Sequence, residues 1–272
     1  MKARILTAVL LLPFAIGAVW YLPNTAFALL LIAMFGIGAW EWGRMMQLTA
    51  PAQTAYLLLL WVLCAAAWWI TSDVQMLRLL IALGAVWWLA ATLWVLVYPA
   101  GLPAGTPRRL LKAVVGLLIL VPAFAAIGHL QGLGEMGPAR VLVLFCLIWG
   151  ADTGAYFAGR SFGKTKLAPA VSPGKTWEGV AGGLTASLIV AAVAGSLLFK
   201  FHGAQLALFL ALAVFTVAIS IVGDLTESMF KRHVGLKDSG RLFPGHGGML
   251  DRTDSMLAAA PCHLLGLMLL GL

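Results

Sequence analysis

The feature that most constrains this chain is a series of apolar windows, each long enough to cross a lipid bilayer. A membrane-spanning helix needs about 20 consecutive, mostly apolar residues. Windows of this kind cover residues 5–22, 25–43, 54–71, 77–98, 110–129, 140–158, 177–198, 204–222 and 255–272. Because hydrocarbon offers no partner for backbone polar groups, each window is expected to be helical. The sequence therefore predicts an all-α, polytopic membrane protein with about nine transmembrane helices.

Composition supports a membrane protein over a soluble one. The chain is 62% hydrophobic and 10% charged, whereas a soluble domain carries roughly 25% charged residues. The first window follows Lys2 and Arg4, as a signal peptide would. Its apolar part is long and further spans follow, so we expect an uncleaved first helix.

The net charge of +8 indicates orientation in the membrane, and we expect no nucleic-acid partner. Lysine and arginine collect in cytoplasmic loops and at cytoplasmic helix ends. With nine spans and a cytoplasmic N-terminus, only Arg78, Arg140 and Lys200 of the 18 basic residues fall on the opposite side. The charge pattern thus predicts a cytoplasmic N-terminus. Tryptophans such as Trp20 and Trp61 are expected near span ends, in an interfacial belt.

Charge also divides the chain into two parts. We expect N-terminal transmembrane helices over 1–145 and a C-terminal catalytic half over 146–272, with cytoplasmic loops at 159–176 and 223–254. The N-terminal part contains no motif that indicates a reaction. Glu41 lies near the end of the second span. It either faces an aqueous cavity or forms an interfacial ion pair with Arg44, and the ion pair is the favoured expectation.

A polar segment follows in the sixth span and the loop after it. Asp152 lies near the cytoplasmic end of that span, where hydrocarbon would penalise a carboxylate, so we expect it to face protein or water. A hydrogen bond between helices is the alternative. Gly174-Lys175-Thr176 resembles the end of a P-loop, but Pro169 replaces the first glycine and no strand is expected before it. We therefore reject a P-loop and retain Ser172 and Lys175 as phosphate-binding candidates near a helix N-terminus.

The segment 223–254 concentrates acidic side chains in an apolar chain. Half of the ten acidic residues fall there, namely Asp224, Glu227, Asp238, Asp251 and Asp254. Asp224 and Glu227 have i, i+3 helical spacing, as do Asp251 and Asp254, so each pair can share one helix face. Carboxylates from two helices can converge on Mg²⁺, which prefers oxygen ligands and keeps water and phosphate oxygens in its other positions. Helix capping and ion pairs are the structural alternatives.

Cations and glycines between these acidic pairs suit phosphate groups. The basic residues of the segment are Lys231, Arg232, Lys237, Arg241 and Arg252. Such side chains clamp phosphates, and backbone amides around Gly247 and Gly248 can form an anion-binding nest. His246 is a general base, a phosphate ligand or a turn residue, and the sequence alone does not separate these roles.

A longer run of these residues resembles a known family. The signature of the phosphatidate cytidylyltransferase (CDP-diacylglycerol synthase) family is similar to Ser228-x-Phe230-Lys231-Arg232, four residues, and Lys237-Asp238-x-Gly240-x-x-Phe243-Pro244-x-His246-Gly247-Gly248-Met249-x-Asp251-Arg252-Thr253-Asp254. Residues 151–156 and 172–179 resemble a shorter second region of that family. The resemblance covers roughly 149–254, and the N-terminal spans agree only in number and hydrophobicity.

The resemblance implies transfer of a cytidylyl group from CTP to phosphatidic acid, giving CDP-diacylglycerol and pyrophosphate. It assigns Asp224 and Asp251 to Mg²⁺, with K⁺ as a further cation, and it makes the pair catalytic together with Lys231 and Arg252. The supporting acids are Asp152, Glu227 and Asp254. The implied substrate-binding residues are Ser172, Lys175, Arg232, Lys237, His246, Gly247 and Gly248.

The same resemblance implies a homodimer surrounded by membrane lipids in the inner membrane of a bacterium, with the active site facing the cytoplasm. A transporter of an anionic phosphorylated solute is the alternative function, because intramembrane charge and glycine-rich breaks also mark transport pathways. That alternative expects polar residues near the bilayer midplane in both halves, whereas charge gathers at one surface here. A CDP-alcohol phosphotransferase would require an Asp-Gly-x-x-Ala-Arg pattern that the sequence lacks.

Overall fold

The computed structural model describes residues 2–98, 106–243, 245 and 247–272, with side chains described from residue 11 and, after the first gap, from residue 109. It is a bundle of long helices with one small hairpin. The elements are α1 (Lys2–Tyr21), α2 (Asn24–Met45), α3 (Ala50–Ile70), α4 (Val74–Val97), α5 (Thr106–Gln131), η1 (Gly134–Met136), α6 (Gly137–Phe162), β1 (Lys166–Ala168), β2 (Ser172–Thr176), α7 (Trp177–Val193), η2 (Ala194–Leu198), α8 (Gly203–His233) and α9 (Leu250–Leu270).

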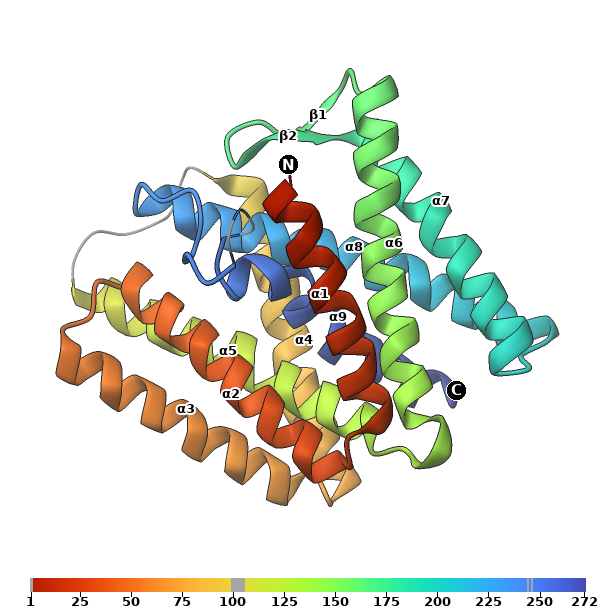
Figure 1. Ribbon diagram of the computed structural model, residues 1–272, viewed down its shortest axis with the longest axis horizontal. Helices are drawn as coiled ribbons and strands as arrows, with labels where there is room; N and C mark the ends of the chain where they lie inside the picture. The colour runs from red at the N-terminus through yellow and green to blue at the C-terminus, as the bar shows by residue number, and fades with distance from the viewer. Residues whose placement is uncertain (1, 99–105, 244, 246) are drawn as a thin grey trace.

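Successive helices run back and forth between two ends of the bundle (Figure 1). The N-terminus, the β1–β2 hairpin and the α8–α9 connection lie at the upper and left end of the view, together with the α2–α3 connection. The α5–α6 and α7–α8 connections and the C-terminus lie at the opposite, right-hand end. This alternation places the polar segments 163–176 and 234–243 at one end of the molecule, as expected of loops on one side of a membrane.

The all-α, polytopic prediction is confirmed. Eight helices of the part of the chain described here are long and apolar enough to cross a membrane, namely α2 to α9. The first predicted span coincides with α1, whose described side chains form an apolar stretch over Leu11–Tyr21. The count of nine spans and the cytoplasmic side of the N-terminus stay predictions.

Helix α9 lies at the centre of the bundle, in contact with α2, α4, α5, α6 and α8. Its middle, Ala258–Ala260, is fully buried, because small side chains let neighbouring helices approach closely. The same principle joins α6 to α7: a Cβ added at Gly183 would lie 2.7 Å from the carbonyl oxygen of Ala151. The Gly179-x-x-x-Gly183 spacing on α7 therefore serves close packing against α6 within this chain.

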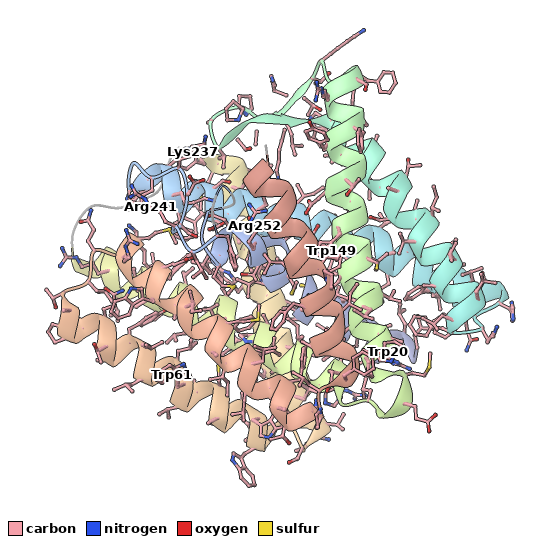
Figure 2. The ribbon with its side chains drawn as sticks, in the orientation of Figure 1. Trp20, Trp61, Trp149, Lys237, Arg241 and Arg252 are labelled. Atoms are coloured by element: carbon pink, nitrogen blue, oxygen red, sulfur yellow. The ribbon has the colours of Figure 1, made fainter. Side chains whose placement is uncertain are left out.

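The structure differs from the sequence expectations in three places. Helix α8 continues to His233, into the segment treated as a loop, because its buried side chains continue along one face through Phe230. A strand does precede Gly174-Lys175-Thr176: β1 pairs antiparallel with β2, in which this tripeptide lies. The lysine is thus part of a hairpin instead of a P-loop. Trp20 lies at the end of α1, but Trp61 lies midway along α3, away from either span end (Figure 2).

Candidate active site

A buried lysine on α8 joins two acidic side chains. The ammonium of Lys231 lies 3.1 Å from Oε2 of Glu227, one helical turn earlier, and 2.5 Å from Oδ1 of Asp251 on α9. All three side chains are less than 10% exposed. Because an unpaired buried charge is costly, each of these groups depends on the others. The two predicted catalytic residues Lys231 and Asp251 are thus brought into direct contact across 20 residues of sequence.

The second oxygen of Asp251 is held by the connection before α9. Its Oδ2 accepts hydrogen bonds from the amide of Gly248 at 2.8 Å, the amide of Ser239 at 2.8 Å and the hydroxyl of Ser239 at 3.0 Å. Gly247 has a φ of +83°, and a Cβ there would strike the Asp251 carboxylate. The glycines expected to bind a substrate anion therefore surround a carboxylate of the chain itself, and the Gly248 amide is already used.

Asp224, the other predicted metal ligand, meets the hairpin. Its Oδ2 lies 2.6 Å from the ammonium of Lys175 on β2, and its Oδ1 accepts a hydrogen bond from Ser228 at 3.2 Å. The side chains of Lys175 and Asp224 are 25% and 30% exposed, so the pair lies at the edge of the buried cluster, within reach of solvent. Ser172 starts the same strand, opposite Ala168. The two loops predicted to form one site therefore meet here.

Close packing of α8 on α9 adds further acids to the cluster. A Cβ at Gly223 would lie 2.5 Å from the carbonyl oxygen of Asp254, so the two backbones touch beside Asp224. The carboxylate of Asp254 interacts electrostatically with both Asp224 and Glu227. Asp152 of α6 interacts with Asp224 and also with the cations Lys175 and Arg252. The three acids expected to support the site thus lie beside its predicted ligands.

Glu41 also belongs to this cluster, and the interfacial ion pair predicted for it is wrong. The expected ion pair with Arg44 is absent among the described salt bridges. Instead, the carboxylate is 4% exposed and accepts hydrogen bonds from the amides of Met249 and Leu250 and from the hydroxyl of Ser239. The only sequence signal for this role was an acid in an apolar helix, since its partners lie about 200 residues away.

Exposed cations surround the cluster. Figure 2 shows Lys237 and Arg241 on the α8–α9 connection and Arg252 nearer the centre, at the start of α9. Arg232 is exposed and donates a hydrogen bond to the carbonyl oxygen of Leu236 at 3.3 Å. His246 lies outside the described residues. The exposed cations can meet a charged ligand from solvent, whereas Lys231 is committed to two carboxylates.

The acids suit a hard cation that is shared with substrate. Among the residues described here, no group of three or more His, Cys, Asp or Glu side chains is arranged to hold a metal ion alone. Asp224 and Asp251 nevertheless offer carboxylate oxygens from two adjoining helices, and Mg²⁺ is commonly held by one or two carboxylates plus substrate phosphates and water. Each carboxylate already contacts an ammonium group, so a bound cation would share these oxygens with Lys175 and Lys231.

Comparison with known proteins identifies the family of this chain. A model of the cytidylyltransferase family matches residues 2–270. A protein of Pseudomonas aeruginosa named phosphatidate cytidylyltransferase is 46% identical over 264 residues, which cover 96% of this chain and 94% of the relative. Proteins with the same name from Haemophilus influenzae and Brucella suis are 39% and 34% identical, with 96% and 90% of their lengths covered. This chain therefore belongs to the cytidylyltransferase family.

Proposed function

We propose that this membrane protein transfers a cytidylyl group from CTP to phosphatidic acid and releases pyrophosphate. The observation that carries the proposal is the meeting of Asp224, Lys231 and Asp251 from α8 and α9 with Lys175 of the hairpin at one end of the bundle. The names of the relatives supply the substrate class. The transporter alternative is not pursued, because the family match is to transferases.

In the proposed reaction, a phosphate oxygen of the lipid attacks the α-phosphorus of CTP, and the bond to the β-phosphate breaks so that pyrophosphate leaves. Two anions must be brought together and held in line, which calls for positive charge and positioning. We propose that Lys175 and Arg252 bind phosphates at the exposed edge of the site, together with the exposed Arg232 and Lys237. Lys231 holds Asp251 in a fixed position and offsets part of the negative charge of Glu227 and Asp251.

Asp224 and Asp251 are our proposed ligands for Mg²⁺, which when bound neutralises nucleotide phosphate charge. The supporting acids Asp152, Glu227 and Asp254 add negative potential that favours a divalent cation at this place. Ser228 and Ser239 orient the two ligands by hydrogen bonds. A requirement for K⁺ and assembly as a homodimer stay predictions from the family resemblance.

The lipid substrate suits a site at one end of a membrane bundle. We propose that phosphatidic acid approaches from the cytoplasmic leaflet of a bacterial inner membrane with its acyl chains remaining in lipid. Moving an acyl chain into water costs about 0.8 kcal/mol per CH₂, so a site at the membrane surface avoids that cost during turnover. The basic residues at this end support a cytoplasmic orientation.

A direct assay tests the function. Purified protein in detergent is incubated with phosphatidic acid, Mg²⁺ and CTP labelled at the α-phosphate, and label is sought in the lipid fraction. We expect labelled CDP-lipid from the wild type, and its loss in Asp224→Asn and Asp251→Asn. The control Asp73→Asn changes an exposed carboxylate that caps α4 at the far end and should keep activity. No labelled lipid from folded wild-type protein would reject the proposal, and ATP in place of CTP tests base choice.

A further inference from the structure

We propose that Glu41 is a positioning residue of the active site, which fixes the first turn of α9 and, through Ser239, the carboxylate of Asp251. Glu41 lies on α2, in the part of the chain to which the sequence assigned no chemistry. The inference rests on the proposed role of Asp251 as a metal ligand, and it extends the site to a helix outside the family signature.

The carboxylate of Glu41 satisfies three donors from the segment before and at the start of α9. Oε1 accepts the amide of Met249 at 2.9 Å, while Oε2 accepts the amide of Leu250 at 2.9 Å and the hydroxyl of Ser239 at 2.8 Å. The first amides of a helix have no partner within the helix. Met249, at the N-cap position, has no side-chain oxygen to supply one. Glu41 therefore provides from α2 the cap that α9 lacks in its own sequence.

The charge of Glu41 also suits this position. A helix N-terminus carries partial positive charge, so a carboxylate there is favoured, and more so when it is buried. Lys231 is engaged by Glu227 and Asp251, so the charge of Glu41 is met by amides and a hydroxyl instead of that ammonium. Loss of the Glu41 charge should therefore weaken the first turn of α9 itself.

Two glycines of the family signature make room for the Glu41 carboxylate. A Cβ at Gly240 or at Gly248 would collide with its oxygen atoms. Neither glycine has a positive φ, so backbone conformation does not explain the residue type at these positions. Close approach of the Glu41 carboxylate does. The connection between α8 and α9 is therefore shaped to receive an acid from α2.

Ser239 transmits the position of Glu41 to Asp251. Its hydroxyl oxygen lies 2.8 Å from Oε2 of Glu41 and 3.0 Å from Oδ2 of Asp251, and its amide donates to the same Oδ2. A hydroxyl has one proton, so it can donate to only one of the two carboxylates at a time. When it donates to Glu41, Oδ2 of Asp251 keeps the amides of Ser239 and Gly248, which use its two lone pairs, and the free direction lies on Oδ1, beside Lys231.

The test compares Glu41→Gln with a matched capping variant, Asp73→Asn. Glutamine has the shape of glutamate but presents an amide nitrogen to one set of donors, so it cannot accept all three bonds. Asp73 accepts the amides of Gln75 and Met76 at the start of α4. The α3–α4 connection lies at the end of the bundle away from the β1–β2 hairpin (Figure 1). Activity is measured against Mg²⁺ concentration, and hydrogen exchange is measured for peptides spanning 247–253.

We expect Glu41→Gln to raise the half-saturating Mg²⁺ concentration by about 10-fold or more, as loss of a group that orients a metal ligand does. Exchange over 247–253 should become faster. Glu41→Asp, which keeps the charge with a shorter reach, should give an intermediate shift. Asp73→Asn should leave the Mg²⁺ dependence unchanged. If Glu41→Gln does not fold, Ser239→Ala decides, since it breaks the link to Asp251 while both amide bonds to Glu41 remain.

An unchanged half-saturating Mg²⁺ concentration in these variants would overturn the proposal. This holds even if their total activity falls, provided that it falls only in proportion to the amount of folded protein. Such a fall would mark Glu41 as a stability residue. Failure of the proposed function is distinguishable, because the wild type itself would then form no CDP-lipid. In that event, unchanged exchange over 247–253 in Glu41→Gln would still reject the capping role.

Discussion

Lys231→Met should destabilise the protein strongly, even though methionine retains most of the side-chain length. The ammonium lies between Glu227 and Asp251, and its removal leaves two buried carboxylates without a cation. Breaking a buried ion pair by removing one partner costs about 3–5 kcal/mol. Asp251 keeps its bonds to Ser239 and Gly248, so most of the cost should fall on Glu227, whose ion pair among the described residues is with Lys231.

A thiol-reactive dye measures this loss. Cys64 and Cys262 are 0% and 2% exposed, so they react only when the bundle opens. Cys146 is exposed and is replaced by alanine in every variant to remove background. At roughly 2–4 °C per kcal/mol for a chain of this size, the unfolding midpoint of Lys231→Met should fall by about 6–20 °C. The matched control is Lys237→Met, which removes an exposed lysine and should shift the midpoint little.

Adding Glu227→Gln to Lys231→Met separates charge from packing. The amide removes the uncompensated charge while it keeps the shape, so the double variant should regain a large part of the lost stability. The reasoning is refuted if Lys231→Met unfolds at the temperature of Lys237→Met, because the buried triad would then contribute nothing. It is also refuted if Glu227→Gln recovers no stability, because the loss would then come from packing alone.

Three further predictions concern packing and the metal. Gly223→Ala places a Cβ 2.5 Å from the carbonyl oxygen of Asp254 and 2.8 Å from the Cβ of Ala258. We expect the free energy of unfolding to fall by about 1–3 kcal/mol and kcat to fall markedly. A wild-type kcat would show that α8 and α9 can separate freely. Gly183→Val, which meets the carbonyl oxygen of Ala151 at 2.7 Å, should lower the unfolding midpoint in the dye assay, and an unchanged midpoint would deny tight α6–α7 packing. Chelation of divalent cations should abolish CDP-lipid formation and added Mg²⁺ should restore it, whereas full activity in chelator would exclude Mg²⁺.

The helices could be predicted from the sequence because hydrocarbon imposes one simple rule on every span. The rule locates apolar stretches, but it does not locate helix ends in polar segments. Helix α8 therefore extends past Gly223 to His233, which places Asp224, Glu227 and Lys231 on one continuous helix. The i, i+3 spacing of Asp224 and Glu227 indicates helical geometry beyond the end of the apolar stretch, in agreement with the extent of α8.

The site could be predicted in part, because its residues are local in sequence. Lys231 and Asp251 lie within one signature, whereas Glu41 lies on another helix and its partners are mostly backbone amides. Backbone amides leave no mark on the sequence, so no pattern could have paired Glu41 with α9. The contact of Phe230 is also with α2, far away in the sequence. Its ring packs edge-to-face against Trp42 at 4.9 Å between centroids.

The glycines of the signature show why a motif can be located correctly and its chemistry misjudged. Glycine-rich loops commonly expose amides to anions, and that reasoning is sound for Gly248, whose amide does bind a carboxylate. The anion is Asp251 of the chain itself, and the space beside Gly240 is taken by Glu41. We therefore expect phosphate recognition to depend chiefly on side-chain cations such as Lys175 and Arg252. The loop instead holds two acids in place, which is what a site built on fixed carboxylates requires.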